Sequence, residues 1–170
     1  LKNRRALDVV LHRLLDGGTS FAVMQVDLDY FKAINDTLGH AAGDHVLQTV
    51  AQVMLAETRS KDLVARVGGD EFTVVLPDVP NEDVLSRIGK RINQRLTEPI
   101  VFQGKNCKIS ASIGTVWIKA GEQANFWDVL ADADLALYAS KKKGRATQTF
   151  YHTGLREAEG LPDGPQNNVR

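Results

Sequence analysis

Apolar residues recur at helical spacing in four stretches of the chain, which span residues 7–17, 46–58, 84–96 and 126–142. Repeats at i, i+3, i+4 and i+7 are typical of amphipathic helices, and a glycine after the last apolar residue is typical of a helix end. Such glycines follow the first and last stretches at Gly17 and Gly144. We therefore predict four helices, with residues 30–36 as a short connecting stretch before a turn at Gly39.

Shorter apolar runs alternate with these helices and indicate strands. A run at 21–26 passes directly into Asp27-Leu28-Asp29, and the runs at 63–67 and 72–76 enclose residues 68–71 at the spacing of a hairpin. Residues 100–102 and 108–118 predict a second hairpin around Gly104, and 147–151 an edge strand. Helices mixed with adjacent hairpins favour an α+β fold, a sheet with helices packed on it.

The composition supports one folded domain followed by a tail. The chain has 170 residues, of which 43% are hydrophobic and 25% charged, as in ordinary globular proteins. From Gly154 onward the sequence is polar and punctuated by Gly and Pro, so we expect a domain over 1–153 and a linker or frayed end over 154–170.

Charge and cysteine content exclude some partners and settings. Lys plus Arg number 21 and Asp plus Glu number 21, so nothing indicates general attraction to nucleic acid or an anionic membrane. Any bound anion must be held by a local cluster. Cys107 is the single cysteine and forms no internal disulfide, which favours a reducing cytoplasm. No apolar run approaches the roughly 18 residues of a membrane helix.

Two pairs of acidic residues stand where side chains converge. Asp27 and Asp29 end the first strand, and Asp70 and Glu71 lie at the first hairpin tip. If that strand lies beside the hairpin, Asp27 and Asp70 face each other as hard oxygen ligands suited to Mg²⁺ with a nucleoside triphosphate. Gly68-Gly69 would let a bulky ligand approach the backbone and would tolerate positive φ. The alternative for these four residues alone is an ordinary tight turn with solvated acids.

The chain resembles the diguanylate cyclase, or GGDEF, family from Leu1 to about Tyr151. The residues that carry the resemblance are Gly68-Gly69-Asp70-Glu71-Phe72, Asp27-Leu28-Asp29-Tyr30-Phe31-Lys32-Ala33-Ile34-Asn35-Asp36 with Gly39-His40 and Gly43-Asp44, and Ala133-Asp134-Leu135-Ala136-Leu137-Tyr138 with Lys141 and Gly144-Arg145. Leu1 to Arg5 looks like the end of the family's N-terminal motif, so we expect a domain excised from a longer protein. Ser140 and Ala146 depart from the usual alanine and asparagine.

The resemblance implies a fold and a reaction. The fold is a central, mostly antiparallel five-stranded sheet flanked by helices, similar to the palm of nucleotidyl cyclases and polymerases. The reaction condenses two GTP molecules into cyclic di-GMP with release of pyrophosphate, across an antiparallel homodimer in which each protomer holds one GTP. It depends on Mg²⁺, with Mn²⁺ as the alternative. A guanine-reading pair disfavours a general polymerase or an adenylyl cyclase, and nucleic acid is not an expected partner.

The same resemblance assigns residues to roles. Asp27, the Leu28 carbonyl and Asp70 would hold the metal, and Asp70, with Glu71 beside it, would assist deprotonation of the ribose 3′-hydroxyl. The expected GTP contacts are Asn35 and Asp44 for guanine, His40 near the ribose or base, Lys32, Lys141 and Arg145 for phosphates, and Phe31, Gly68 and Gly69 around them. A purely structural role is the alternative for His40, and we expect Lys142 and Lys143 to be a solvated helix end.

A second site and a second function follow from the remaining motifs. Arg59 and Asp62 stand where the family carries its RxxD product-inhibition motif, with a surface ion pair as the alternative. The ending from Phe150 to Glu157 looks like the exit of GGDEF domains that continue into an EAL phosphodiesterase domain. The alternative function is therefore a catalytically silent GTP- or cyclic di-GMP-binding regulator. Sensory or EAL domains are expected on the same chain, in the cytoplasm or in the cytoplasmic part of a membrane-anchored protein.

Overall fold

A computed structural model describes residues 1–161 of the chain. The helices are α1 (Arg4–Gly17), α2 (Phe31–Leu38), α3 (His40–Glu57), α4 (Glu82–Leu96), α5 (Phe126–Lys142) and α6 (Leu155–Ala158). The strands are β1 (Phe21–Asp29), β2 (Leu63–Arg66), β3 (Glu71–Pro77), β4 (Ile100–Phe102), β5 (Lys105–Cys107), β6 (Ser110–Ile118) and β7 (Gln148–Phe150).

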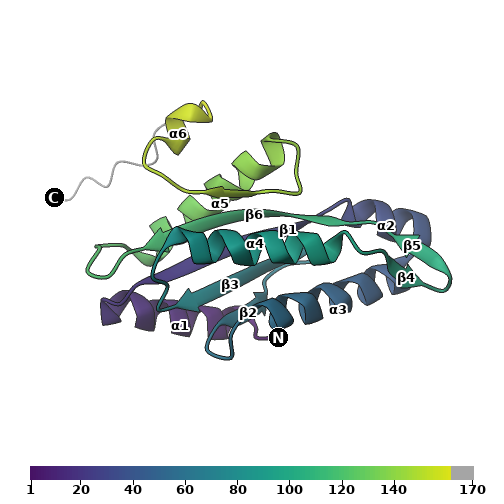
Figure 1. Cartoon of the computed structure of the whole chain (residues 1–170), viewed down its shortest axis with the longest axis horizontal. Helices are drawn as coiled ribbons and strands as arrows, with labels where there is room; N and C mark the ends of the chain where they lie inside the picture. The colour runs from purple at the N-terminus through teal and green to yellow at the C-terminus, as the bar shows by residue number, and fades with distance from the viewer. Residues whose placement is uncertain (162–170) are drawn as a thin grey trace.

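Five strands form the central sheet in the order β2-β3-β1-β6-β7 (Figure 1). Every neighbouring pair is antiparallel except β6 with the short edge strand β7, which is parallel. The predicted α+β class, the mostly antiparallel sheet and the edge strand near 147–151 are confirmed. The register sets Asp27 opposite Glu71, so the acidic end of β1 lies beside the hairpin tip as the sequence required.

Helices cover both faces of this sheet because alternate residues of the central strand point to opposite sides. Met24 and Val26 face a core shared with α2, α3 and α4, whereas Phe21 and Val23 face α1 and α5. In Figure 1, α4 crosses in front of the sheet. The central strand β1 is buried on both faces along almost its whole length, which makes it a rigid support for the carboxylates at its end.

The segment between β1 and the second predicted helix differs from the prediction. Residues 31–38 form α2 instead of a connecting stretch, and α3 begins at His40 and not near Val46. In α2 only Phe31 and Ile34 are buried, too few positions to establish a helical period in the sequence. The predicted turn at Gly39 is confirmed, and its φ of 92° is one that favours glycine.

The second predicted hairpin pairs different residues. Ile100–Phe102 pairs with Lys105–Cys107 as a separate two-stranded sheet, and Ser110–Ile118 joins the central sheet beside β1. The reason is the turn, because Gln103 and Gly104 both have positive φ, as in the tight two-residue turns that join adjacent strands. This turn fixes Phe102 opposite Lys105 and leaves the longer apolar run for the main sheet.

The region after Gly154 is partly ordered against the domain. Leu155–Ala158 forms α6, and Leu155 is buried against Leu135, Ala136 and Ala139 of α5. The expectation of an unanchored end from Gly154 is therefore wrong for residues 155–158, while 162–170 lie outside the described residues. Within residues 1–161, no helix is long and apolar enough to cross a membrane.

Candidate active site

Carboxylates from β1 and the hairpin tip meet at one end of the sheet. The Leu28 N–H donates to the Asp70 carbonyl at 3.1 Å, which continues the β1–β3 pairing up to the tip. The pKa of Asp70 is raised, first by burial and then by the negative charge of Asp27 and a hydrogen bond with it. The negative charge of Asp27 thus destabilises the ionised form of Asp70, the condition that a shared cation relieves.

Lys141 reaches this site from α5 because α5 packs unusually close to β6. A Cβ atom at Gly114 of β6 would lie 2.1 Å from the Leu137 backbone nitrogen and 2.3 Å from the Ala133 carbonyl oxygen, so only glycine allows the approach. The approach brings the Lys141 ammonium into an ion pair with the Asp27 carboxylate. Lys141 therefore supplies positive charge directly beside the predicted metal ligands.

A cavity of about 200 Å³ joins most of the predicted metal and phosphate ligands. It is lined by Asp27, Leu28, Asp29, Tyr30, Phe31, Lys32, Asp70, Lys141 and Arg145. Tyr30, in the left-handed conformation with φ of 66°, precedes α2, and no side chain caps this helix start. The first N–H groups of a helix lack intrahelical partners and attract anions, so the start of α2 could bind an anion. Arg145 lies with its guanidinium carbon 5.8 Å from the centre of the Tyr30 ring.

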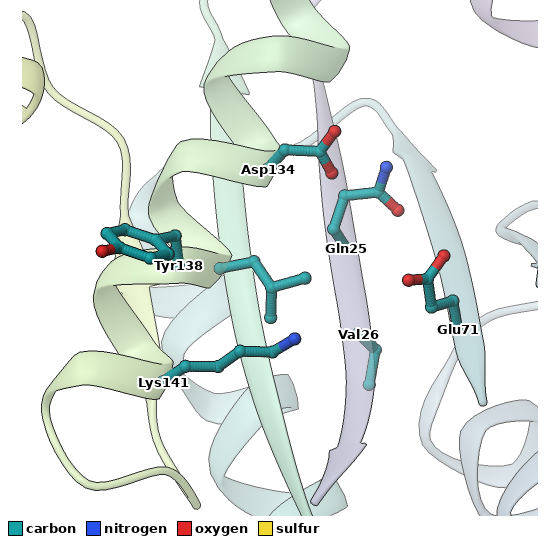
Figure 2. A pocket seen from close by; sticks show the side chains of 7 residues that line it. Gln25, Val26, Glu71, Asp134, Tyr138 and Lys141 are labelled. Atoms are coloured by element: carbon teal, nitrogen blue, oxygen red, sulfur yellow. The ribbon is translucent and has the colours of Figure 1, made fainter. Parts of the chain in front are cut away.

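A neighbouring cavity of about 260 Å³ lies between β1, β3 and α5. Figure 2 shows the side chains of Gln25, Glu71 and Asp134 turned toward one another, with the Lys141 ammonium below them and the Tyr138 ring pointing away. Gln25 hydrogen-bonds both Thr73 and Asp134. The pKa of Asp134 is raised, first by burial and then by the charge of Glu71. Glu71 therefore lines a different cavity from Asp70, and the two cavities meet at Lys141.

The predicted guanine-reading residues lie on either side of the turn between α2 and α3, Asn35 on α2 and Asp44 on α3. A Cβ at Gly43 would lie 1.9 Å from the Asn35 Oδ1 atom, so the Asn35 amide occupies the space that glycine leaves, one residue before Asp44. Asp44 is exposed and lines a groove of about 490 Å³ together with Arg66. His40 is exposed in the first turn of α3. The sequence motif alone assigns no role to Gly43, and in the structure its missing side chain leaves room for the Asn35 amide.

The backbone conformation of the glycines at the hairpin tip differs from the prediction. Neither Gly68 nor Gly69 has positive φ, so conformational freedom does not explain them. A Cβ at Gly69 would meet nothing within 4 Å, and one at Gly68 would lie 3.0 Å from a Glu71 carboxylate oxygen. Arg66 fixes the tip by donating from Nε to the Gly68 and Gly69 carbonyls at 3.1 and 3.0 Å. The prediction that these glycines let a ligand approach the backbone does not depend on positive φ and stays a prediction.

Arg59 and Asp62 lie together and bind each other. The Arg59 Nε and Nη2 atoms donate to the Asp62 carboxylate at 2.9–3.2 Å, and Nη2 also donates to the Pro77 carbonyl at 2.8 Å. The Asp62 side chain is fully buried in this arrangement, whereas that of Arg59 is 41% exposed. The structure thus contains the ion pair weighed as the alternative, and a ligand can reach Asp62 only if this pair opens.

The predicted metal ligands fit a hard divalent cation whose remaining ligands come from the substrate. Among residues 1–161 no cluster of three or more His, Cys, Asp or Glu side chains is arranged around a common point for a metal. Two carboxylates and a carbonyl, Asp27, Asp70 and Leu28, nevertheless match the way Mg²⁺ binds, through one or two carboxylates and phosphate oxygens. These three residues would hold the ion only together with a triphosphate.

Comparison with known proteins identifies the family. Residues 1–147 match the model of the family described as "Diguanylate cyclase, GGDEF domain". The cyclic di-GMP phosphodiesterase NbdA of Pseudomonas aeruginosa is 38% identical over 91% of this chain and 20% of its own length. The probable diguanylate cyclase DgcE of Escherichia coli is 38% identical over 89% of this chain and 14% of its own.

A solved structure of similar fold supports the same assignment. The coiled coil and GGDEF domain of DgcB from Caulobacter crescentus, in complex with cyclic di-GMP, matches with a TM-score of 0.80 and 32% identity over 88% of this chain and 81% of that one. The chain belongs to the GGDEF family of diguanylate cyclase domains. It spans 20% of the length of NbdA and 14% of that of DgcE.

Proposed function

We propose that this domain condenses two GTP molecules into cyclic di-GMP with release of pyrophosphate. The observation that carries the proposal is the cavity at the end of β1, where Asp27, Asp70, Lys141 and Arg145 surround the uncapped start of α2. Phosphoryl transfer needs carboxylates that bind a metal cation. Beside them it needs cationic side chains and backbone N–H groups that bind phosphate. Family membership supports the same reaction.

The residues around the cavity have different roles in binding the triphosphate. Lys32, Lys141 and Arg145 neutralise phosphate charge, and the first N–H groups of α2 donate to phosphate oxygens. Asp27, Asp70 and the Leu28 carbonyl would hold Mg²⁺, which when bound neutralises triphosphate charge and acidifies a coordinated hydroxyl. Lys141 is paired with Asp27, and its ammonium would neutralise phosphate charge.

Asp70 is the group that we assign to proton removal. In this account it accepts the proton of the 3′-hydroxyl that attacks the α-phosphorus of the other GTP, while pyrophosphate leaves. Its carboxylate lies in the same cavity as that of Asp27, where the triphosphate would bind. Glu71, one residue on and facing the adjacent cavity, adds negative charge that keeps Lys141 at the site. Asn35 and Asp44 bind the guanine edge, with His40 nearby at the start of α3.

The reaction needs two copies of the chain. Each new phosphodiester joins the 3′-oxygen of one GTP to the α-phosphorus of the other, and each protomer has a single cavity of this composition within residues 1–161. Two protomers facing each other in antiparallel orientation would supply both substrates. Sensory or EAL domains on the same polypeptide would then control activity by bringing the two copies together.

The test is product formation by a dimeric form of the domain. With GTP and Mg²⁺ the protein should yield cyclic di-GMP, and Asp70→Asn should yield none while retaining GTP binding. Product formation that persists without the Asp70 carboxylate would overturn its assignment. A dimer that binds GTP but makes no product would favour the second candidate, a silent regulator attached to a phosphodiesterase domain, which the similarity to NbdA supports.

Product inhibition at Arg59 and Asp62 is a separate part of the proposal. A guanine that binds Asp62 must displace Arg59, whose freed guanidinium can then contact phosphate or the base. Cyclic di-GMP binding should therefore weaken in Arg59→Ala and inhibition of turnover should be lost. Equal product affinity in Arg59→Ala and the unmodified protein would leave the pair as a structural ion pair.

A further inference from the structure

The carboxylate of Asp29 is used differently from that of Asp27. Its side chain is 1% exposed, and both oxygens are taken by protein donors. Oδ1 accepts from Ser112 Oγ at 2.7 Å, and Oδ2 accepts from Ser110 Oγ at 2.5 Å and from the Ala146 N–H at 3.0 Å. Both Asp29 oxygens are therefore engaged by protein donors, although Asp29 lines the same cavity as Asp27.

The Ala146 N–H belongs to a turn with unusual backbone geometry. Gly144, Arg145 and Ala146 have consecutive φ angles of 109°, 68° and 51°. Two of these residues are not glycine, and alanine has no side-chain group that stabilises a left-handed conformation. The Gly144 and Arg145 N–H groups donate to the Lys141 and Ser140 carbonyls at the end of α5, and among the described residues the Asp29 carboxylate is the partner that holds the Ala146 N–H.

The anchored turn carries Arg145. Its guanidinium Nε lies 4.0 Å from Asp29 Oδ1, its guanidinium carbon lies 5.8 Å from the centre of the Tyr30 ring, and both Arg145 and Tyr30 line the cavity. Because Asp29 also binds two serines of β6, it fastens β1, β6 and the turn after α5 at one point. A shift of that turn would move Arg145 away from the cavity without altering Asp27 or Asp70.

We propose that Asp29 is a positioning residue that holds the Gly144–Ala146 turn in its left-handed conformation and thereby aims Arg145 at the triphosphate of bound nucleotide. This inference rests on the proposed function in one respect, that Arg145 contacts phosphate. It assigns the second aspartate of the motif to phosphate recognition through Arg145, and not to metal binding or to fold stability alone.

The experiment is a double-mutant cycle read by binding calorimetry with two probes, GTP and guanosine. Asp29→Asn replaces one acceptor oxygen with an NH2 group and removes the negative charge beside the Ala146 N–H and Arg145, so it weakens the hold on the turn. We expect it to weaken GTP binding at least tenfold in the unmodified background, to leave guanosine binding unchanged, and to weaken GTP binding less than twofold when added to Arg145→Ala. Glu57→Gln is the matched carboxylate-to-amide control, because Glu57 pairs with Arg91 and Arg95 far from the cavity.

A second substitution that relieves the backbone strain of the turn distinguishes a positioning role of Asp29 from a merely structural one. Ala146→Gly removes the steric cost of positive φ, so in the Asp29→Asn background it should restore most of the lost GTP affinity. Equal losses for GTP and guanosine, or additive effects with Arg145→Ala, would overturn the proposal. If Asp29→Asn does not fold, Ser112→Ala removes one donor and should show the same probe dependence with a smaller loss.

An amide-exchange measurement distinguishes failure of this inference from failure of the proposed function. Asp29→Asn should accelerate hydrogen exchange of the Ala146 N–H selectively, whatever nucleotide the protein binds. Faster exchange in a protein that binds no GTP would overturn the proposed function and keep the anchor. Unchanged exchange in a protein that does bind GTP would overturn the anchor alone.

Discussion

Replacing Gly43 by alanine should remove guanine recognition while leaving the fold intact. The added Cβ would lie 1.9 Å from Asn35 Oδ1, 2.9 Å from Asn35 Cγ and 3.3 Å from the Phe31 ring, so the Asn35 side chain must leave its position. Gly43 lies within α3, where alanine is favoured over glycine by about 1 kcal/mol, and this offsets part of the strain. The substitution therefore displaces the Asn35 amide and does not disrupt helix α3.

The magnitude follows from the hydrogen bonds that Asn35 would make to guanine. Leaving polar groups of a bound base unpaired costs about 1–3 kcal/mol, which corresponds to roughly 5- to 150-fold in affinity. Calorimetry with GTP should show a loss in this range for Gly43→Ala, whereas inorganic triphosphate, which lacks the base, should bind as before. Gly17→Ala is the matched control, since a Cβ there meets nothing within 4 Å.

A combination with Asn35→Ala gives the decisive comparison. If displacement of Asn35 is the whole effect, Gly43→Ala should add almost nothing once that side chain is gone. Full additivity of the two substitutions, or an equal loss of triphosphate binding, would refute the reasoning and show that Gly43 acts through the helix or through Phe31.

Three further substitutions test the support of the site. Gly114→Ala should push α5 off β6, lowering stability by about 1–3 kcal/mol and GTP affinity with it, in thermal melts and calorimetry. Burial, and then the charge of Asp128, raise the pKa of Asp132 to about 6, so folding binds a proton and stability falls as pH rises from about 4 to 6. Asp132→Asn should flatten that slope in urea titrations and, after discounting for partial exposure, stabilise the protein by roughly 1 kcal/mol at pH 7; an unchanged slope would contradict the assignment. Leu155→Ala should cost about 2 kcal/mol in urea unfolding, and no loss would mean that α6 does not anchor on α5.

The central part of the site was predictable because it depends on strand order. Asp27 ends an apolar strand and Asp70 lies at a hairpin tip, so one assumption, that the two strands are neighbours, brings them together. The positions of Lys141 and Arg145 could not be predicted from strand order alone, because they depend on a helix that crosses back to the end of β1. The family motif supplied that placement, and the close contact at Gly114 is its physical basis.

Other features depend on contacts that no local pattern encodes. The sequence shows Asp29 as one more acid near Asp27, and only the pairing of β1 with β6 reveals that two serines and a distant N–H consume its oxygens. Helix α2 was missed because its few buried positions set no period. Gln25 and Asp134 were given no role because their hydrogen bond links different elements.

The measurement that tests the central claim most directly is product analysis by liquid chromatography and mass spectrometry. The domain, dimerised by a fused coiled coil, is incubated with GTP and Mg²⁺ beside an Asp70→Ala control. The account predicts cyclic di-GMP from the unmodified protein and none from the control. A verified dimer that binds GTP and yields no cyclic di-GMP would contradict it.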